Sequence, residues 1–501
     1  MKRKSALLNI FSGIFSKIIT LVLAIVVPKL IIENYGSEYN GLISSITGIF
    51  IYLNLLEAGV GGASIQALYS QIAQKNQDKI NGIFSATSNY YTKTGIYFLA
   101  CVAVMAFLYP LAVHSQISYF KIVMLILISA CPTLVSYFFQ GKYNILITAD
   151  NKSYIVTAFL TIFNILSNIV KIILIVWGSD IVVVLLSSAV LSMINSIIFV
   201  RYIKKRYSNL NPLVTPDFAA ISKKNDVMAF QILGIIIHNT DVLLLTLFCD
   251  LKVVSVYSIY NMIIAQIVSF PQIFTKGIIG GMGQLYYENI SKFKKVFNFY
   301  EAYYIALSFV FFITTYILLT PFLKLYISNT DINYIDKWLP LLFIMISIQE
   351  GIRFPSGDVF TITGQYKDLK NYAITEAILN IVLSLILVKF FGIYGVLIGT
   401  FLSMFYFTFA SIKYVSKKIL QRSNILPLRR ALACLCLATV LILFSNTIDF
   451  HIENYFQFLC VGILVFILLS VLYIVLISLI EKEARATLFE YLKPSLGKFL
   501  K

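Results

Sequence analysis

Fourteen apolar segments, each long enough to cross a lipid bilayer, follow one another through the 501 residues of this chain. A hydrocarbon core about 30 Å thick requires about 20 apolar residues in a helix. The mean hydropathy is +0.85, and 59% of the residues are hydrophobic. The pattern predicts an all-α polytopic membrane protein with spans at residues 5–32, 40–68, 88–113, 119–141, 153–177, 180–203, 227–249, 253–283, 298–321, 338–362, 369–391, 393–416, 429–448 and 453–480.

Basic residues are concentrated in alternate connections between these spans. Of the 40 Lys and Arg residues, 29 fall in one set of connections, six fall within spans, and five fall in the other set: Lys121, Lys252, Lys324, Lys337 and Lys389. The positive-inside rule assigns the rich set, and therefore both termini, to the cytoplasm. The net charge of +17 reflects this bias together with attraction to anionic lipid, and it does not indicate a nucleic-acid partner.

The chain has signs of an internal repeat. Glycine clusters at Gly59–Gly62 and Gly277–Gly283 each end a span that enters from outside. The connection at 204–226 contains helix-breaking prolines and is typical of a linker. We expect two six-helix bundles related by pseudo-two-fold symmetry, at 1–203 and 227–416, with 417–501 forming two further helices and a cytoplasmic tail. Chance similarity between apolar helices is the alternative. Two halves in one chain can build a cavity without a partner, so we expect a monomer.

Catalytic and metal chemistry has little support in the sequence. The six cysteines lack metal-ligand spacing, and no Walker-type glycine loop is present. We therefore predict no cofactor, no metal, no catalytic residue and no direct use of ATP. The start resembles a signal peptide, but the apolar run is too long, Lys17 interrupts it, and no small-residue cleavage site follows. A retained first helix is the better interpretation.

Ionisable residues inside the spans are the candidate functional residues, because charge is costly in hydrocarbon. The cations are Lys17, Lys171 and Arg353. The acidic or ion-coupling candidates are Asp241, His238, Glu57, Glu350 and Glu376. We expect them to line a cavity. Lys171 alternatively extends to the outer interface, and Glu350 and Arg353, three residues apart, alternatively form a structural ion pair.

Several motifs resemble the Wzx-type polysaccharide-transport flippases, of the superfamily that also contains multidrug and toxin extrusion proteins. They include Tyr35-Gly-Ser-Glu-Tyr-Asn-Gly, Leu56-Glu-Ala-Gly-Val-Gly-Gly and Lys389-Phe-Phe-Gly-Ile-Tyr-Gly-Val-Leu-Ile-Gly-Thr. The matches cover about residues 5–415, and the last two helices match in length and placement alone. The motifs indicate the family far better than the cargo.

The resemblance implies a flippase of the bacterial plasma membrane. Such proteins carry undecaprenyl-diphosphate-linked oligosaccharides across the bilayer for O-antigen, capsule or exopolysaccharide assembly. A polysaccharide polymerase and a chain-length regulator are then the implied partners, besides membrane lipid. Lys17, Arg353 and Lys171 are suited to the diphosphate, and Asp241 and His238 to proton coupling during alternating access. A multidrug extruder is the main alternative, although it would favour a predominantly acidic cavity. A glycosyl-transfer enzyme would require a long outer loop that the chain lacks.

Overall fold

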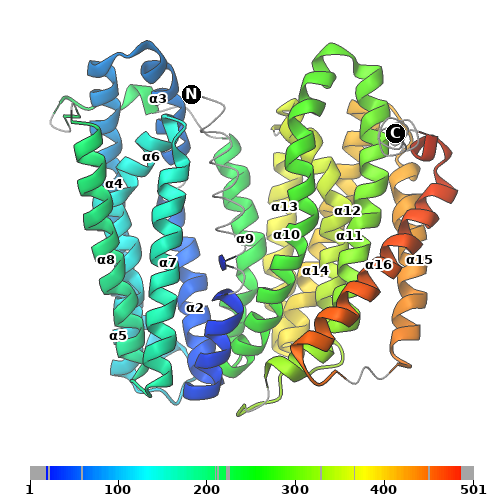
Figure 1. Ribbon diagram of the computed structural model, residues 1–501, viewed down its shortest axis with the longest axis horizontal. Coiled ribbons are helices and arrows are strands. Elements are labelled where there is room, and N and C mark those ends of the chain that lie inside the picture. Colours follow the sequence, from blue (N-terminus) through cyan, green and yellow to red (C-terminus); the bar gives the residue numbers. More distant parts are fainter. Residues whose placement is uncertain are drawn as a thin grey trace, which may run out of the picture. The chain divides into compact units, whose positions relative to one another are not determined.

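The computed structural model describes residues 19–20, 23–57, 60–208, 210–211, 214–221, 226–327, 330–365, 367–448 and 452–486. All regular structure in these residues is helical (Figure 1). Eleven of the described helical segments are long and apolar enough to span a membrane. Together they confirm the predicted all-α polytopic class. The chain divides into two compact units, Met1–Ser258 and Ile259–Lys501. This division does not test the predicted internal repeat, which therefore stays a prediction.

The first unit begins with a helical stretch at 23–35 and continues through eight labelled helices. These are α2 (Ser37–Leu53), α3 (Val60–Gln74), α4 (Gln77–Ala112), α5 (Tyr119–Val135), α6 (Gly141–Ala149), α7 (Ser153–Val176), α8 (Ile181–Arg206) and α9 (Asp226–Phe248). The boundary between the units falls inside α10 (Leu251–Glu288). The second unit continues with α11 (Ile290–Tyr326), α12 (Leu339–Thr363), α13 (Lys370–Phe391), α14 (Ile393–Tyr414), α15 (Ile425–Ser445) and α16 (Tyr455–Ile480).

Every predicted span from 40–68 onward has a helical counterpart, but two spans are interrupted. Residues 40–68 do not form one helix: α2 passes into a 3₁₀ turn at Asn54–Glu57, and α3 begins at Val60 beside the glycine cluster. The span from Tyr119 contains a π-helical turn at Ser136–Gln140, which joins α5 to α6. Pro132 lies one turn before it and removes a backbone donor from the helix. Hydropathy detects the apolar length but not these local changes in hydrogen bonding.

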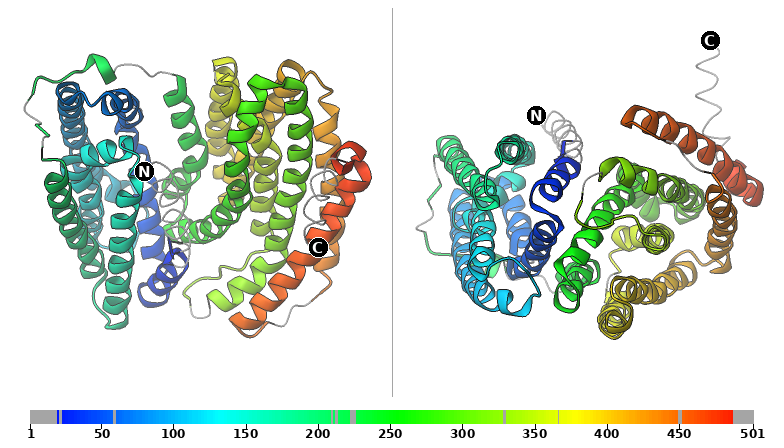
Figure 2. Two further views of the ribbon diagram at one scale, coloured as in Figure 1. Left: turned by 45° about the horizontal axis from the view of Figure 1, so that its top comes forward. Right: turned by 90° about the horizontal axis from the view of Figure 1, so that it is seen from below.

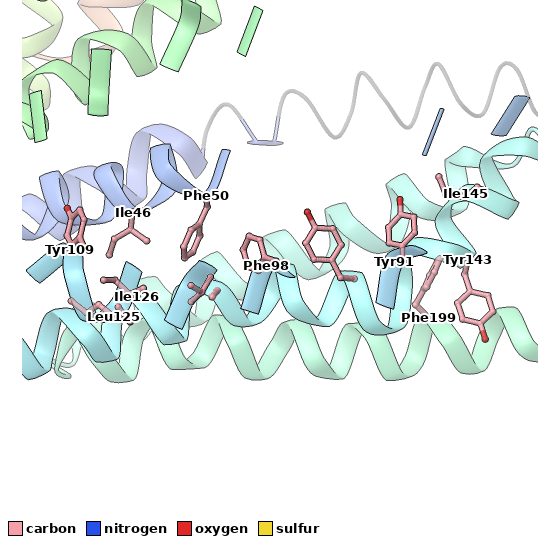
Figure 3. Packing of buried hydrophobic residues seen from close by; sticks show 14 of the residues in the cluster. Ile46, Phe50, Tyr91, Phe98, Tyr109, Leu125, Ile126, Tyr143, Ile145 and Phe199 are labelled. Atoms are coloured by element: carbon pink, nitrogen blue, oxygen red, sulfur yellow. The ribbon is translucent and has the colours of Figure 1, made fainter. Parts of the chain in front are cut away.

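Aromatic and aliphatic side chains of α2, α4 and α5 form part of the core of the first unit, which continues onto α6, α7 and α8. Figure 3 shows Ile46 and Phe50 of α2 close to Phe98 and Tyr109 of α4. The Phe50 and Phe98 rings meet edge to face, with centroids 5.7 Å apart. Leu125 and Ile126 of α5 are fully buried in the same cluster. This core fixes the helices that carry the polar groups described below.

Small residues on one face of α2 allow α9 and α10 to pack closely against it. A Cβ atom added at Gly41 would stand 1.8 Å from the backbone oxygen of Leu251, so only glycine fits. Four residues later Ser45 accepts hydrogen bonds from Tyr109 (2.8 Å) and Thr246 (2.7 Å). Close backbone approach and buried hydroxyl bonds are the usual basis of helix association in membranes.

In the second unit, α13 and α14 pack in the same way. Gly395 and Gly399 lie one turn apart on α14, and added Cβ atoms would stand 2.1 Å from the Leu387 oxygen and 2.5 Å from Ser384 Oγ. The fully buried Asn380 donates to Thr400 across this contact at 3.0 Å. These glycines belong to the motif that begins at Lys389, so its spacing has a packing cause. Elsewhere in this unit, α15 and α16 both pack against α11 (Figure 2).

Candidate functional site

Two of the predicted site residues cannot be placed in full. Lys17 lies outside the described residues, and so does the side chain of His238, whose backbone belongs to α9. The roles assigned to these two residues stay predictions. The other six candidates lie on described helices, in four separate environments.

Glu57 lies in the 3₁₀ turn that separates α2 from α3. Tyr91 of α4 donates its hydroxyl hydrogen to Glu57 Oε1. Tyr137, in the π-helical turn, donates to Asn54 Oδ1 at 3.0 Å. Gly141 makes room for Tyr91, because a Cβ atom there would stand 2.1 Å from the tyrosine ring. Tyr137 thus joins the two irregular turns, and Tyr91, whose ring contacts Tyr137, holds the Glu57 carboxylate of the first turn.

Asp241 is enclosed by protein and is 3% exposed. Tyr257, near the start of α10, donates to Asp241 Oδ2 at 3.0 Å. On the preceding residue, the Thr240 hydroxyl lies 2.9 Å from the Tyr52 hydroxyl of α2. Together the two bonds connect α2, α9 and the part of α10 that belongs to the first unit.

Lys171 lies on α7 at the end of a polar stripe formed with Asn164 and Asn168. The spacing of four and three residues puts the three side chains on one helical face. Asn168 donates to Asn164 Oδ1 at 2.6 Å. No ion pair joins Lys171 to any described carboxylate, and its side chain is half-buried. The role of Lys171 stays a prediction.

Arg353 pairs with Glu376 of α13, not with Glu350 on its own helix. Arg353 Nη1 donates to Glu376 Oε1 at 2.8 Å. The two side chains are 16% and 2% exposed. The guanidinium carbon also lies 5.4 Å from the centre of the Phe407 ring of α14. Two predicted site residues thus come together, and helices α12, α13 and α14 hold the guanidinium.

Asp358, which the sequence interpretation missed, is buried on α12 and accepts a hydrogen bond from Tyr300 of α11. It lies inside the predicted span 338–362, so the criterion that selected Glu350 would also have selected it. Glu350 itself is half-buried one turn before Arg353. Three charged residues of α12 thus lie within nine positions, and α12 is not among the eleven strongly apolar spans.

A network of three arginines and two glutamates joins the last helices of the second unit. Arg430, at the start of α15, is 0% exposed. Its Nη1 lies 2.7 Å from Glu301 of α11, and its Nη2 lies 3.0 Å from Glu481, which directly follows α16. Arg422 also pairs with Glu301, and Arg429 pairs with Glu481 at 2.6 Å. Glu301 was missed as well, although it falls within the predicted span 298–321.

The arginines of this network favour the charged form of Glu481. Burial alone would raise the pKa of Glu481, but the hydrogen bonds from Arg430 and Arg429 outweigh it, so the pKa lies below its ordinary value. Asn298 completes the cluster by accepting from Arg430 at 2.6 Å and from Arg422 at 3.1 Å. The Nη atoms of Arg422 and Arg430 are thereby committed to protein groups, which suits a structural role, whereas the Nε atoms of both are buried without a described partner.

No protein-family model matches the chain, and the comparison with curated proteins finds no match. Comparison with solved structures finds clear similarity. The lipid II flippase MurJ, in an inward closed conformation, aligns over 95% of this chain and 99% of its own, with 15% identity and a TM-score of 0.66. The chain has the MurJ and MATE transporter fold.

Two multidrug transporters support the same conclusion. An inward-facing MATE family transporter of the MOP superfamily aligns over 86% of this chain and 96% of its own, with 13% identity and a TM-score of 0.55. The MATE multidrug transporter DinF-BH aligns over 83% of this chain and 96% of its own, with 14% identity and a TM-score of 0.52. At these identities the comparisons establish the fold. The chain is a multi-pass membrane protein.

Proposed function

We propose that this protein flips undecaprenyl-diphosphate-linked oligosaccharide repeat units across the bacterial plasma membrane by alternating access. The product would serve O-antigen, capsule or exopolysaccharide biosynthesis. The protein would act as a monomer beside a polysaccharide polymerase and a chain-length regulator. Among its relatives in fold, the lipid II flippase aligns over the larger share of the chain, which supports a lipid-linked cargo.

The main structural support for this proposal is how few of the hydrogen-bond donors of Arg353 are used by described protein groups. A guanidinium has five N–H donors. Among the described residues, one hydrogen bond occupies Arg353, from Nη1 to Glu376. The side chain is 16% exposed, and no atom of it is a buried donor without a partner. The remaining donors are therefore not sealed off without a partner, and a diphosphate that reaches them can accept two of them at once.

Glu376 gives this cation a means of release. A guanidinium that met a diphosphate alone in low dielectric would bind it tightly, because charge-assisted hydrogen bonds are strong there. The carboxylate already holds Arg353 and competes with the incoming phosphate. Asp241 and His238 remain our proposed groups for proton coupling, and Lys17 and Lys171 our further proposed phosphate partners. Glu57 and Glu350 complete the proposed set of cavity carboxylates.

The test separates a binding role of Arg353 from a structural one. In cells lacking the native flippase, we expect Arg353→Ala to abolish surface polysaccharide while Arg353→Lys keeps part of it. The double variant Arg353→Ala/Glu376→Ala removes both charges, so it should restore any stability lost with the ion pair. Export should nevertheless stay absent. Export restored by the double variant, at normal protein abundance, would show that Arg353 acts through the pair alone.

A multidrug extruder is the second candidate, and one observation favours it. Among the candidate residues whose side chains the structure describes, with Asp358 added, carboxylates outnumber cations. They are Glu57, Asp241, Glu350, Asp358 and Glu376 against Lys171 and Arg353. Such a balance suits cationic compounds. Proteoliposomes decide between the two functions: accumulation of a cationic dye without lipid-linked sugar supports extrusion, and its absence together with sugar-lipid translocation supports the flippase.

A further inference from the structure

A cavity of about 870 Å³ lies within the second unit where α11 ends, α12 begins and α15 ends. Its apolar wall includes Ile317 and Pro321 of α11, Leu341 of α12 and Leu443 of α15. Its polar rim includes Lys324, Lys337 and Trp338. Pockets that hold small ligands typically measure about 300–1,000 Å³ and combine apolar walls with a few polar groups.

The rim carries an excess of positive charge that protein groups do not neutralise. The carboxylate among the rim residues is that of Asp336, and both of its oxygens accept hydrogen bonds from protein groups. Oδ1 accepts from the backbone N–H groups of Trp338 (2.7 Å) and Leu339 (2.8 Å), and Oδ2 accepts from the Tyr394 hydroxyl (2.5 Å). Lys324 and Lys337 are exposed, and no ion pair joins either of them to a described carboxylate. The Lys337 ammonium lies 5.3 Å from the centre of the Trp338 ring.

The position of these lysines is unusual for this chain. The predicted topology allows five basic residues on the outer side, and two of them are at this one cavity. Lys121, by contrast, forms an ion pair with Asp180 at 2.8 Å. Because the predicted topology places few cations on the outer side, the presence of two of them beside an apolar wall indicates that the cavity binds a ligand with an anionic head and an apolar body. Trp338 is 56% exposed, as interfacial tryptophans often are.

We propose that this cavity binds an anionic phospholipid of the outer leaflet. Lys324 and Lys337 hold the phosphodiester, and the acyl chains lie along the wall formed by α11 and α15. Phosphate accepts charge-assisted hydrogen bonds from ammonium groups, and apolar side chains such as Leu443, 64% exposed, gain by covering the chains. The proposal rests on this lining and on the predicted topology, and not on the cargo proposed above.

The chain contains two tryptophans, Trp177 and Trp338, which permits a direct test. In the Trp177→Phe protein, fluorescence reports on the cavity alone. Reconstituted into liposomes, this protein should be quenched at least about twofold more by phosphatidylglycerol with brominated acyl chains than by equally brominated phosphatidylcholine. The Trp338→Phe protein, which reports on the exposed Trp177 of the first unit, should show no headgroup preference.

Substitution of the cations completes the test. Lys324→Gln/Lys337→Gln in the Trp177→Phe background should abolish the preference, whereas Lys389→Gln, an exposed basic residue at the end of α13, should preserve it. Millimolar inorganic phosphate should leave the quenching unchanged. Equal quenching by both lipids, a preference that survives the double substitution, or displacement by free phosphate would each overturn the lipid site.

Discussion

At the scale of single residues, Arg430 places a full positive charge in the interior of the described structure. It is the largest fully buried side chain, and its charge is compensated by two carboxylates from different helices. An isolated buried guanidinium would be highly unfavourable, so the arrangement exists only while α11, α15 and the end of α16 are together. The Arg353 guanidinium differs from that of Arg430, because among the described residues a single hydrogen bond, to Glu376, occupies it.

Removal of Arg430 should therefore destabilise the protein strongly. We expect Arg430→Met to cost about 3–5 kcal/mol, because Glu301 and Glu481 each lose a buried partner. Arg429→Gln, at an exposed position of the same network, should cost about 1 kcal/mol or less. Thermal unfolding of detergent-solubilised protein, followed by fluorescence-detected gel filtration, measures both. Similar melting temperatures for the two variants would contradict this account of the network.

The charged pairs also show which contacts cannot be predicted from the sequence. Hydropathy placed Arg353 and Glu376 within spans, but spacing along one helix pointed to Glu350 as a partner. The actual partner is 23 residues away on α13. Arg430 and Glu301 are 129 residues apart, so no local pattern could join them. Glu301 and Asp358 were detectable as charges within predicted spans, whereas their partners required the fold.

At the scale of helices, glycine spacing determines which neighbours can approach. The spans follow from apolar length, and the contact between α13 and α14 follows from Gly395 and Gly399. The interruptions at Asn54–Glu57 and Ser136–Gln140 were not predicted as such. Their sequences remain apolar enough to pass as continuous helices, and tertiary hydrogen bonds such as Tyr137 to Asn54 stabilise the irregular backbone.

Gly395 provides a direct test of helix contact. A methyl group at this position would overlap the Leu387 oxygen of α13, so Gly395→Ala should destabilise the protein by about 1–3 kcal/mol. The matched control is Gly357→Ala on α12, where no atom lies within 4 Å of the added Cβ. That change should be neutral or slightly stabilising, because alanine favours helix. Equal melting temperatures for both variants would argue against close packing of α13 on α14.

At the scale of the whole molecule, the charge distribution predicts which connections face the cytoplasm. In a cysteine-free background, a cysteine at Asn446 should react with an impermeant maleimide in intact spheroplasts. Cysteines at Ser208 and Ser423 should react only after permeabilisation. All three positions are exposed, so burial does not explain a failure to react. Ser328, a second predicted outer position, lies outside the described residues.

Labelling of Ser208 from outside would overturn the 14-helix assignment and with it the two-bundle interpretation. If Ser423 were also labelled from outside and Asn446 were not, the orientation would be reversed and the cavity beside Trp338 would face the inner leaflet. The fold comparison is insensitive to this question, since a topology and its inverse contain the same helices. The experiment therefore tests the positive-inside assignment separately from the fold.

The arginine network has a consequence for biosynthesis. A ribosome completes α11, with Glu301, more than 100 residues before it reaches Arg430, and Glu481 comes later still. Until then the Glu301 carboxylate has neither Arg422 nor Arg430 beside it, so α11 is an imperfect membrane segment while the chain is incomplete. A chain that ends before Arg422 should therefore carry Glu301 as an acid without its arginine partners, and one that ends before α15 should lack the buried Arg430.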